Sequence, residues 1–152
     1  MNKTTDIFNF FSVEKLLSTS GQPTEAQLSA LADQGYEVVI NLGLHNDPRY
    51  SLPDETGLVK SLGMTYIHIP VQFGAPSEND LESFFNAMES NINKKVHVHC
   101  AANMRVTAFL GLYYLIRQGK SKDEAFAPMK SIWEPDGVWL SFITSMLAKH
   151  AR

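Results

Sequence analysis

Strand-like and helix-like segments alternate along this chain, and the alternation limits the folds that it can adopt. Short apolar segments typical of buried strands cover 36–44, 65–71 and 94–100. Segments whose apolar residues recur at helical spacing cover 24–35, 56–63, 77–91, 105–119 and 121–133, and a last one begins near residue 136. Because strands separated by helices favour parallel pairing, the sequence predicts an α/β fold with a mostly parallel central sheet flanked by helices.

Three of the predicted helices begin with a capping-box pattern, in which a hydroxyl side chain and a polar side chain three residues later bond to each other's backbone amides. The pairs are Thr24 with Gln27, Ser77 with Asp80, and Ser121 with Glu124. These patterns locate the helix starts, and Gly35 and Gly119 follow two of the helices as C-terminal caps.

The size and charge of the chain exclude several classes of protein. With 152 residues, 44% of them hydrophobic, it can bury a core without a disulfide or a metal, and we expect a single domain over 1–152. The formal net charge of -3 provides no basic surface for nucleic acid or an acidic membrane, so neither is expected as a partner. No apolar run approaches the roughly 18 residues that a membrane span needs. One cysteine cannot form an internal disulfide, and the first residues lack the pattern of a secretory signal, so we expect a cytoplasmic protein.

The most informative stretch is VHVHCAANMRVTAF, residues 96–109, which contains the lone Cys100. Cys100 stands at the carboxyl end of a predicted strand, on the loop before a helix, where open α/β sheets bind ligands. Amides at a helix start attract anions and stabilise a thiolate, and Arg105 adds a planar fork of donors that suits two phosphate oxygens. The loop could therefore activate a nucleophile and hold the tetrahedral anion that it attacks. The spacing alone equally allows Cys100 to be a small buried hydrophobe and Arg105 to be solvated at a helix start.

The segment HCAANMRVT resembles a shortened form of the signature of the cysteine-dependent tyrosine and dual-specificity phosphatases, which is His-Cys, five residues, Arg, then Ser or Thr. Residues 18–42 resemble the N-terminal segment of a bacterial tyrosine-phosphatase-like family, once catalogued as a domain of unknown function and also found in beta-lactamase-hydrolase-like proteins. The shared features are the Ser-Gly-Gln-Pro turn, the helix after it and the strand ending Ile-Asn-Leu. The resemblance covers about Thr19 to Gly119, including YIHIPVQFG.

This resemblance implies a tyrosine-phosphatase-like architecture and a role for each matched residue. Cys100 would be the nucleophile, Thr107 would assist its release, and His99 would hold the cysteine loop through a backbone bond. The phosphate-binding loop would comprise Cys100, Ala101, Ala102, Asn103, Met104 and Arg105. Gln22 is suggested to reach the active site, although the Gly-Gln-Pro turn also has a structural role before its helix. No metal or organic cofactor is implied.

Two departures from the family pattern bear on activity. Four residues, not five, separate Cys100 from Arg105, and the usual glycine is missing. Either one residue is deleted from the loop, or Arg105 has moved one place earlier while Thr107 keeps its position. Asn103 could supply the left-handed conformation that a glycine would otherwise provide.

The second departure is that the loop 72–76, where such phosphatases carry an aspartate as general acid, contains no carboxylate. Substitutes are Asp47, Glu78, Asp80 and Asp136. Helix-terminal charge or capping explains the last three better, and a turn role also suits Asp47, which is nonetheless the leading candidate.

Three function classes remain open. The first is a phosphatase that acts on a phosphorylated small molecule or phosphoprotein through a cysteinyl-phosphate intermediate. The second is an inactive pseudophosphatase or phosphate-binding module. The third is a rhodanese-like sulfurtransferase, against which the Ser-Gly-Gln-Pro and Ile-Asn-Leu segments speak.

Two further features have structural explanations. His97 and His99 share one strand face, but Cys100 would point to the other, so a metal site is not expected. Trp133 and Trp139 could line a substrate pocket, but packing around a helix junction is the commoner role for aromatics at this spacing.

Overall fold

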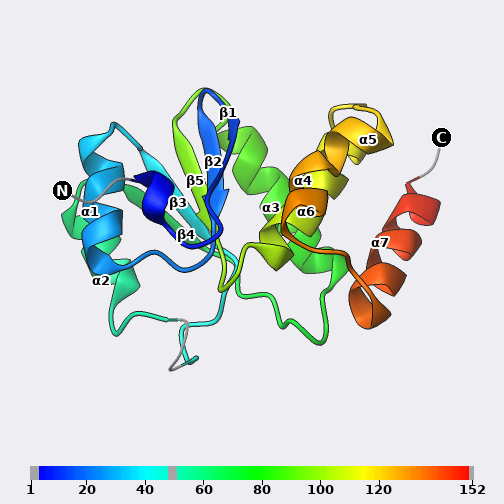
Figure 1. Ribbon diagram of the computed structural model, residues 1–152, viewed down its shortest axis with the longest axis horizontal. Helices are drawn as coiled ribbons and strands as arrows, with labels where there is room; N and C mark the ends of the chain where they lie inside the picture. Colours follow the sequence, from blue (N-terminus) through cyan, green and yellow to red (C-terminus); the bar gives the residue numbers. More distant parts are fainter. Residues whose placement is uncertain (1–3, 48–50, 151–152) are drawn as a thin grey trace.

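The computed structural model describes residues 4–47 and 51–150, which form a five-stranded sheet between two layers of helices (Figure 1). The strands are β1 (Phe11–Glu14), β2 (Leu17–Ser20), β3 (Val38–Asn41), β4 (Thr65–His68) and β5 (Val96–His99). Their order across the sheet is β1-β2-β5-β3-β4, and every neighbouring pair is parallel except β1 and β2. The predicted α/β fold with a mostly parallel sheet is therefore confirmed.

The β1–β2 hairpin was not predicted from the sequence. Strand β2 is Leu-Ser-Thr-Ser, so it lacks the apolar run that marks a buried strand, although all four residues are buried. Its hydroxyl groups are satisfied instead by partners from other segments, because Ser18 and Ser20 bond to His97 and Thr19 accepts a bond from Asn103. Strand β2 can therefore be buried because the tertiary fold supplies hydrogen-bond partners for its hydroxyl groups, and not because its side chains are apolar.

The helical elements largely follow the predicted ranges. They are a short 3₁₀ turn η1 (Thr4–Asp6) and the helices α1 (Glu25–Asp33), α2 (Glu55–Ser61), α3 (Glu78–Ser90), α4 (Met104–Ile116), α5 (Lys122–Ala125), α6 (Ala127–Ile132) and α7 (Gly137–Lys149). Thr24, Ser77 and Ser121 cap α1, α3 and α5 as predicted, and the Thr24 box is reciprocal.

The prediction of one helix over 121–133 was wrong, because α5 and α6 are separate and meet at Phe126. Pro128 lies in the first turn of α6, where its missing amide costs nothing. In one continuous helix its ring would clash with the carbonyl of Glu124, four residues earlier.

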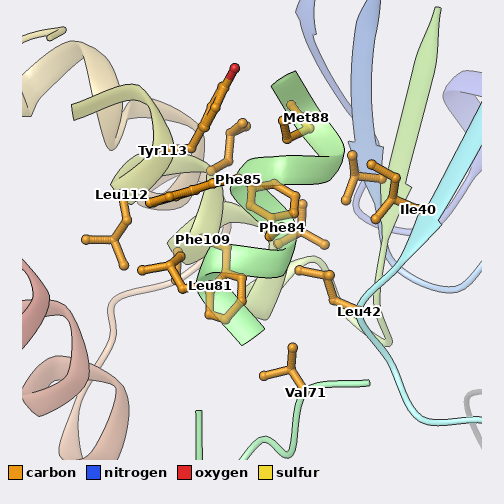
Figure 2. Packing of buried hydrophobic residues seen from close by; sticks show 14 of the residues in the cluster. Ile40, Leu42, Val71, Leu81, Phe84, Phe85, Met88, Phe109, Leu112 and Tyr113 are labelled. Atoms are coloured by element: carbon orange, nitrogen blue, oxygen red, sulfur yellow. The ribbon is translucent and has the colours of Figure 1, made fainter. Parts of the chain in front are cut away.

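Each face of the sheet has its own hydrophobic core. Helices α1 and α2 cover one face and α3 to α7 lie on the other, on opposite sides of the strands in Figure 1. The smaller core includes Leu28, Leu31 and Val59. The larger one is built around α3 and α4, and Figure 2 shows Phe84 and Phe85 of α3 packing between the sheet and the neighbouring helix.

Helix α4 is central to the larger core, since ten of its thirteen residues are buried. A helix that is apolar on nearly all sides is typical of such a position. Among the described residues, no helix combines the length and the apolar character that crossing a bilayer requires.

Candidate functional site

The segment from Cys100 to Arg105 joins the end of β5 to the start of α4. Val96, Val98 and Cys100 belong to the larger core, whereas His97 and His99 point to the opposite face, as alternation along a strand requires. Asn103 has a φ of 65° and is the N-cap of α4, so it adopts the left-handed conformation anticipated from the sequence. Arg105 lies in the first turn of α4, because the helix begins at Met104.

The side chain of Asn103 ties this loop to the N-terminal segment. Its amide nitrogen donates to the Asn9 carbonyl at 2.9 Å and to the Thr19 hydroxyl at 3.0 Å. In return the Asn9 side chain donates to the Ala102 carbonyl at 3.0 Å. These hydrogen bonds fix the short loop to the N-terminal segment and support the strained backbone of Asn103.

The Gly21-Gln22 turn closes over the same loop. The Gln22 amide donates to the Ala101 carbonyl at 3.0 Å. A Cβ on Gly21 would lie 2.6 Å from that carbonyl oxygen, so the close approach requires glycine. The Ser-Gly-Gln-Pro turn is thus part of the framework of the cysteine loop.

Arg105 is 8% exposed, and its guanidinium is held at the edge of a pocket. Its Nη1 donates to the Val71 carbonyl at 2.8 Å, and its Cζ lies 5.8 Å from the centroid of the Phe73 ring. The interpretation of Arg105 as a solvated residue at a helix start is therefore wrong.

The pocket has a volume of about 200 Å³ and lies beyond the carboxyl ends of β3, β4 and β5. Its lining comprises Gly43, Leu44, Asp47, Gln72, Phe73, Gly74, Ala101 and Arg105. Ligands of open α/β sheets bind at this edge. Asp47 and Arg105, from distant segments of the chain, thus line one pocket with Ala101 of the cysteine loop.

Asp47 is the one proposed general acid that lines this pocket. Glu78 is instead paired with Lys149, whose hydrogen bond holds the pKa of Glu78 below its usual range. The backbone amide of Asp80 donates to the Ser77 hydroxyl that caps α3. Asp136 occupies the N-cap position of α7, but its side chain makes no capping hydrogen bond.

Cys100 itself is covered, since it is 1% exposed and is part of the larger core. The pocket is lined by the next residue, Ala101, and by Arg105. Access to the thiol therefore requires the atoms that cover it to move.

His99 belongs to a buried polar cluster that the sequence did not reveal. Its Nε2 lies 2.6 Å from a carboxylate oxygen of Glu55, and its Nδ1 lies 3.4 Å from the Cys100 carbonyl. The Gln22 side chain donates to the other Glu55 oxygen at 2.8 Å. His99 and Gln22, two predicted site residues, are thus joined through Glu55. From the sequence, Glu55 would be interpreted only as helix N-terminal charge beside the Asp54 cap.

The electrostatics of Glu55 favour its ionised form. Burial raises the pKa of its carboxyl, but the charge of His99 and hydrogen bonds from His99, Gln22 and Tyr66 outweigh this and lower it. Burial and the neighbouring Glu55 raise the pKa of Tyr66, so its hydroxyl stays protonated and can donate.

The hydroxyl of Thr107 is engaged at the junction of loop and helix. It donates to the Asn103 carbonyl at 2.8 Å, with the Met104 carbonyl at 3.1 Å, and accepts a bond from Trp133 Nε1 at 3.2 Å. These bonds stabilise the backbone at the start of α4, the helix that carries Arg105.

The two tryptophans pack as expected and also support the pocket. Trp139 is buried in the larger core, and its Nε1 donates to the Phe73 carbonyl at 2.7 Å. The Phe73 ring, which lines the pocket, lies against both Trp133 and Trp139. The tryptophans thus position one wall of the pocket.

His97 has a structural role, since both of its ring nitrogens bond to hydroxyls, those of Ser18 and Ser20, at 2.7 Å. Burial lowers the pKa of His97 well below its usual range, so the ring is neutral. In the part of the chain that the structure describes, the potential metal-binding group is Glu78, Glu82 and His150, which is outside this pocket.

Residues 3–137 match the model of a family described as DSP-PTPase phosphatase fused to NAD+ kinase. A solved structure of a DUF442 protein from Shewanella putrefaciens CN-32, described as a candidate phosphatase, is 35% identical, covers 97% of each chain and has a TM-score of 0.85.

More distant structures share the fold. Tk-PTP in its active form is 21% identical over 93% of this chain and 95% of its own, with a TM-score of 0.74. Kinase associated phosphatase, with its catalytic-site cysteine replaced by serine, is 12% identical over 93% and 94%, with a TM-score of 0.77. No curated protein sequence matches the chain.

Proposed function

Since the chain belongs to the family of DSP-PTPase phosphatases fused to NAD+ kinase, which are hydrolases, we propose that it hydrolyses a phosphate monoester through a cysteinyl-phosphate intermediate on Cys100. The substrate would be a phosphorylated small molecule or a phosphoprotein. We take 1–152 as one phosphatase-like domain, which fits two cores that share one sheet. The reaction needs a reduced thiol, so a reducing compartment such as the bacterial cytoplasm suits it.

The observation that carries this proposal is the pocket that Ala101, Arg105 and Asp47 line together. In the first step the Cys100 thiolate attacks phosphorus, a sulfur–phosphorus bond forms, and the bond to the ester oxygen breaks. In the second step water attacks phosphorus, the bond to sulfur breaks, and phosphate leaves. Loop amides from Ala101 to Arg105, together with the guanidinium, stabilise the equatorial oxygens in both steps.

Arg105 can serve this role although its loop has only four residues. The bond to Val71 uses one of the five guanidinium donors, which leaves others for phosphate oxygens at the pocket. The Val71 bond fixes the plane of the guanidinium, so less rotational freedom is lost when the phosphoryl group binds. The left-handed Asn103 provides the turn that a glycine would supply in the longer loop.

Asp47 is proposed as the general acid that protonates the leaving ester oxygen, because it shares the pocket with Arg105. Thr107 is proposed to assist release of the thiolate in the second step. Its hydroxyl would have to rotate away from the Asn103 carbonyl to donate to sulfur. Met104 and Ala102 complete the loop whose amides bind the phosphoryl group.

Turnover of a small aryl phosphate by the wild type and by Cys100→Ser, with metals chelated, tests this proposal. The expected result is turnover by the wild type that is lost in Cys100→Ser and inhibited by vanadate. Equal activity of the two proteins would refute a cysteine nucleophile.

The burial of Cys100 favours a second candidate, a phosphate-binding module without turnover. Under that function both proteins would bind phosphate with similar affinity, and neither would release the aryl alcohol. The match to a phosphatase family argues against the sulfurtransferase alternative.

A further inference from the structure

The loop that follows β3 carries three residues of the pocket and contacts two histidine rings. Gly43, Leu44 and Asp47 line the pocket, and residues 43–47 are named the Asp47 loop for this reason. His45 lies within the loop and His68 ends β4. Neither histidine is among the described residues that line the pocket. Any effect of these rings on a bound ligand therefore passes through the Asp47 loop.

His68 fixes the start of the loop. Its Nε2 donates to the Gly43 carbonyl at 2.7 Å, and because a carbonyl only accepts, the ring proton lies on that nitrogen. Burial lowers the pKa of His68, so the ring is neutral at neutral pH. The Gly43 amide in turn donates to the Asn41 side chain at 2.7 Å. Both backbone polar groups of Gly43 are thus held, which sets the direction in which the loop leaves the sheet.

Gly43 lies against the cysteine loop. A Cβ added to it would lie 3.6 Å from the Cα of Cys100 and 3.8 Å from the amide nitrogen of Ala101. The bond from His68 therefore acts where the Asp47 loop and the cysteine loop touch. Losing it would change the position of Asp47 relative to the residues proposed to bind the phosphoryl group.

His45 fixes the middle of the loop, two residues before Asp47. Its ring is parallel to that of His68, with centroids 3.7 Å apart and an angle of 5° between the planes. Its Nε2 lies 2.7 Å from the Tyr66 hydroxyl, which also accepts a bond from Asn41 at 3.0 Å. His45 is exposed and belongs to neither hydrophobic core, so these contacts fix the loop and add little to the core.

We propose that His68 and His45 are positioning residues that hold Asp47 where it can protonate the leaving oxygen, and that they thereby extend turnover to esters with poor leaving groups. The inference rests on the proposed function, because it takes Asp47 as the general acid. Proton transfer requires the acid to lie within hydrogen-bond reach of the ester oxygen, and a displacement of about 1 Å can cost about 10²-fold in rate. An activated aryl ester needs little protonation, so it is insensitive to this displacement.

The experiment measures the leaving-group ratio, which is kcat for ethyl phosphate divided by kcat for para-nitrophenyl phosphate. His68→Leu should lower this ratio by about tenfold or more, while kcat for the aryl ester stays within about threefold of the wild type. An unchanged ratio would overturn the proposal.

His68→Gln is the rescue variant, because its amide nitrogen takes approximately the place of Nε2 and can donate to the Gly43 carbonyl. It should restore the ratio to within about threefold of the wild type. If it does not, the bond to Gly43 is not what positions the loop, and the proposal is wrong.

A double-mutant cycle shows whether His68 acts through Asp47. Asp47→Asn should itself lower the ratio, and adding His68→Leu should lower it no further, since the acid that His68 positions is already lost. Additive losses would refute this route. Gly111→Ala is the control for lost stability, because its added Cβ meets Phe126, outside the pocket. It should leave the ratio within about twofold, and an equal fall would refute a specific role of His68.

If His68→Leu does not fold, His45→Leu decides the question, because the His45 side chain is exposed and is not needed for the core. Its ratio should fall by about threefold or more, and an unchanged ratio would overturn the proposal. The two possible failures are distinct. A wild type that hydrolyses neither ester would refute the proposed function and this inference with it. A ratio that falls in Asp47→Asn but in neither histidine variant would refute the inference alone.

Discussion

Replacing Arg105 by lysine keeps the positive charge but removes the planar fork of donors, and its effects on stability and turnover can be derived from the structure. In the wild type one nitrogen bonds to the Val71 carbonyl at 2.8 Å while the rest of the group lines the pocket. A lysine ammonium is a single point and cannot serve both partners with the same geometry. Loss of the charged bond to Val71 should lower the free energy of unfolding by about 1.5–3 kcal/mol.

The effect of Arg105→Lys on turnover should be larger than its effect on stability. The lost donors act on oxygens that gain charge in the transition state, so kcat should fall by about 10²–10³-fold. Arg105→Ala should in addition weaken phosphate binding. The assay is steady-state hydrolysis of a small aryl phosphate together with urea unfolding.

Arg117→Lys is the control, because Arg117 pairs with Glu82 and Glu89, outside the pocket. It should leave kcat within about twofold, a change below 0.5 kcal/mol in the activation free energy. The reasoning about Arg105 would be refuted if Arg105→Lys kept a kcat within about threefold of the wild type while still folding.

Three further predictions concern other parts of the site and the core. Asp47→Asn should reduce kcat by about 10²-fold or more for an alkyl phosphate and much less for an activated aryl phosphate, and equal losses would exclude Asp47 as the acid. Gly111→Ala should lower the free energy of unfolding in urea by about 1–3 kcal/mol, because its Cβ would lie 2.2 Å from the Phe126 ring. Gly74→Ala, which has open space, is the control, and equal effects would contradict the packing argument. The pKa of Glu55 is lowered by folding, so its stabilisation is complete above the ordinary carboxyl pKa of about 4.3 and is lost as pH falls through the folded value. Glu55→Gln should therefore be less stable by about 3 kcal/mol at pH 6, with a difference that shrinks below about pH 4, and a constant difference in acid-unfolding measurements would oppose this.

The parts of the fold that could be predicted are those set by local chemistry. The starts of α1, α3 and α5 are determined by hydroxyl caps that bond within three residues. The left-handed Asn103 follows from its position in a shortened loop before a helix. The caps depend on interactions between neighbours in the chain, which a sequence displays directly. The conformation of Asn103 is also supported by bonds to the distant Asn9 and Thr19.

The parts that could not be predicted depend on contacts between distant segments. Strand β2 is polar and is buried only because His97 and Asn103 complete its hydrogen bonds. Glu55 lies 44 residues from His99, and no spacing rule connects the two. The burial of Cys100 in the larger core, one of the two alternatives that the spacing left open, likewise depends on contacts between distant segments.

The central claim is that Cys100 attacks phosphorus in a cradle formed by its loop and Arg105. A crystal structure with vanadate, which adopts the trigonal bipyramidal geometry of the transition state, tests it most directly. The account predicts a covalent bond from the Cys100 sulfur to vanadium, with the Arg105 guanidinium and the loop amides bonded to the equatorial oxygens. Vanadate in the pocket with Cys100 still buried, or with the guanidinium more than about 6 Å from the anion and so beyond hydrogen-bond reach, would contradict it.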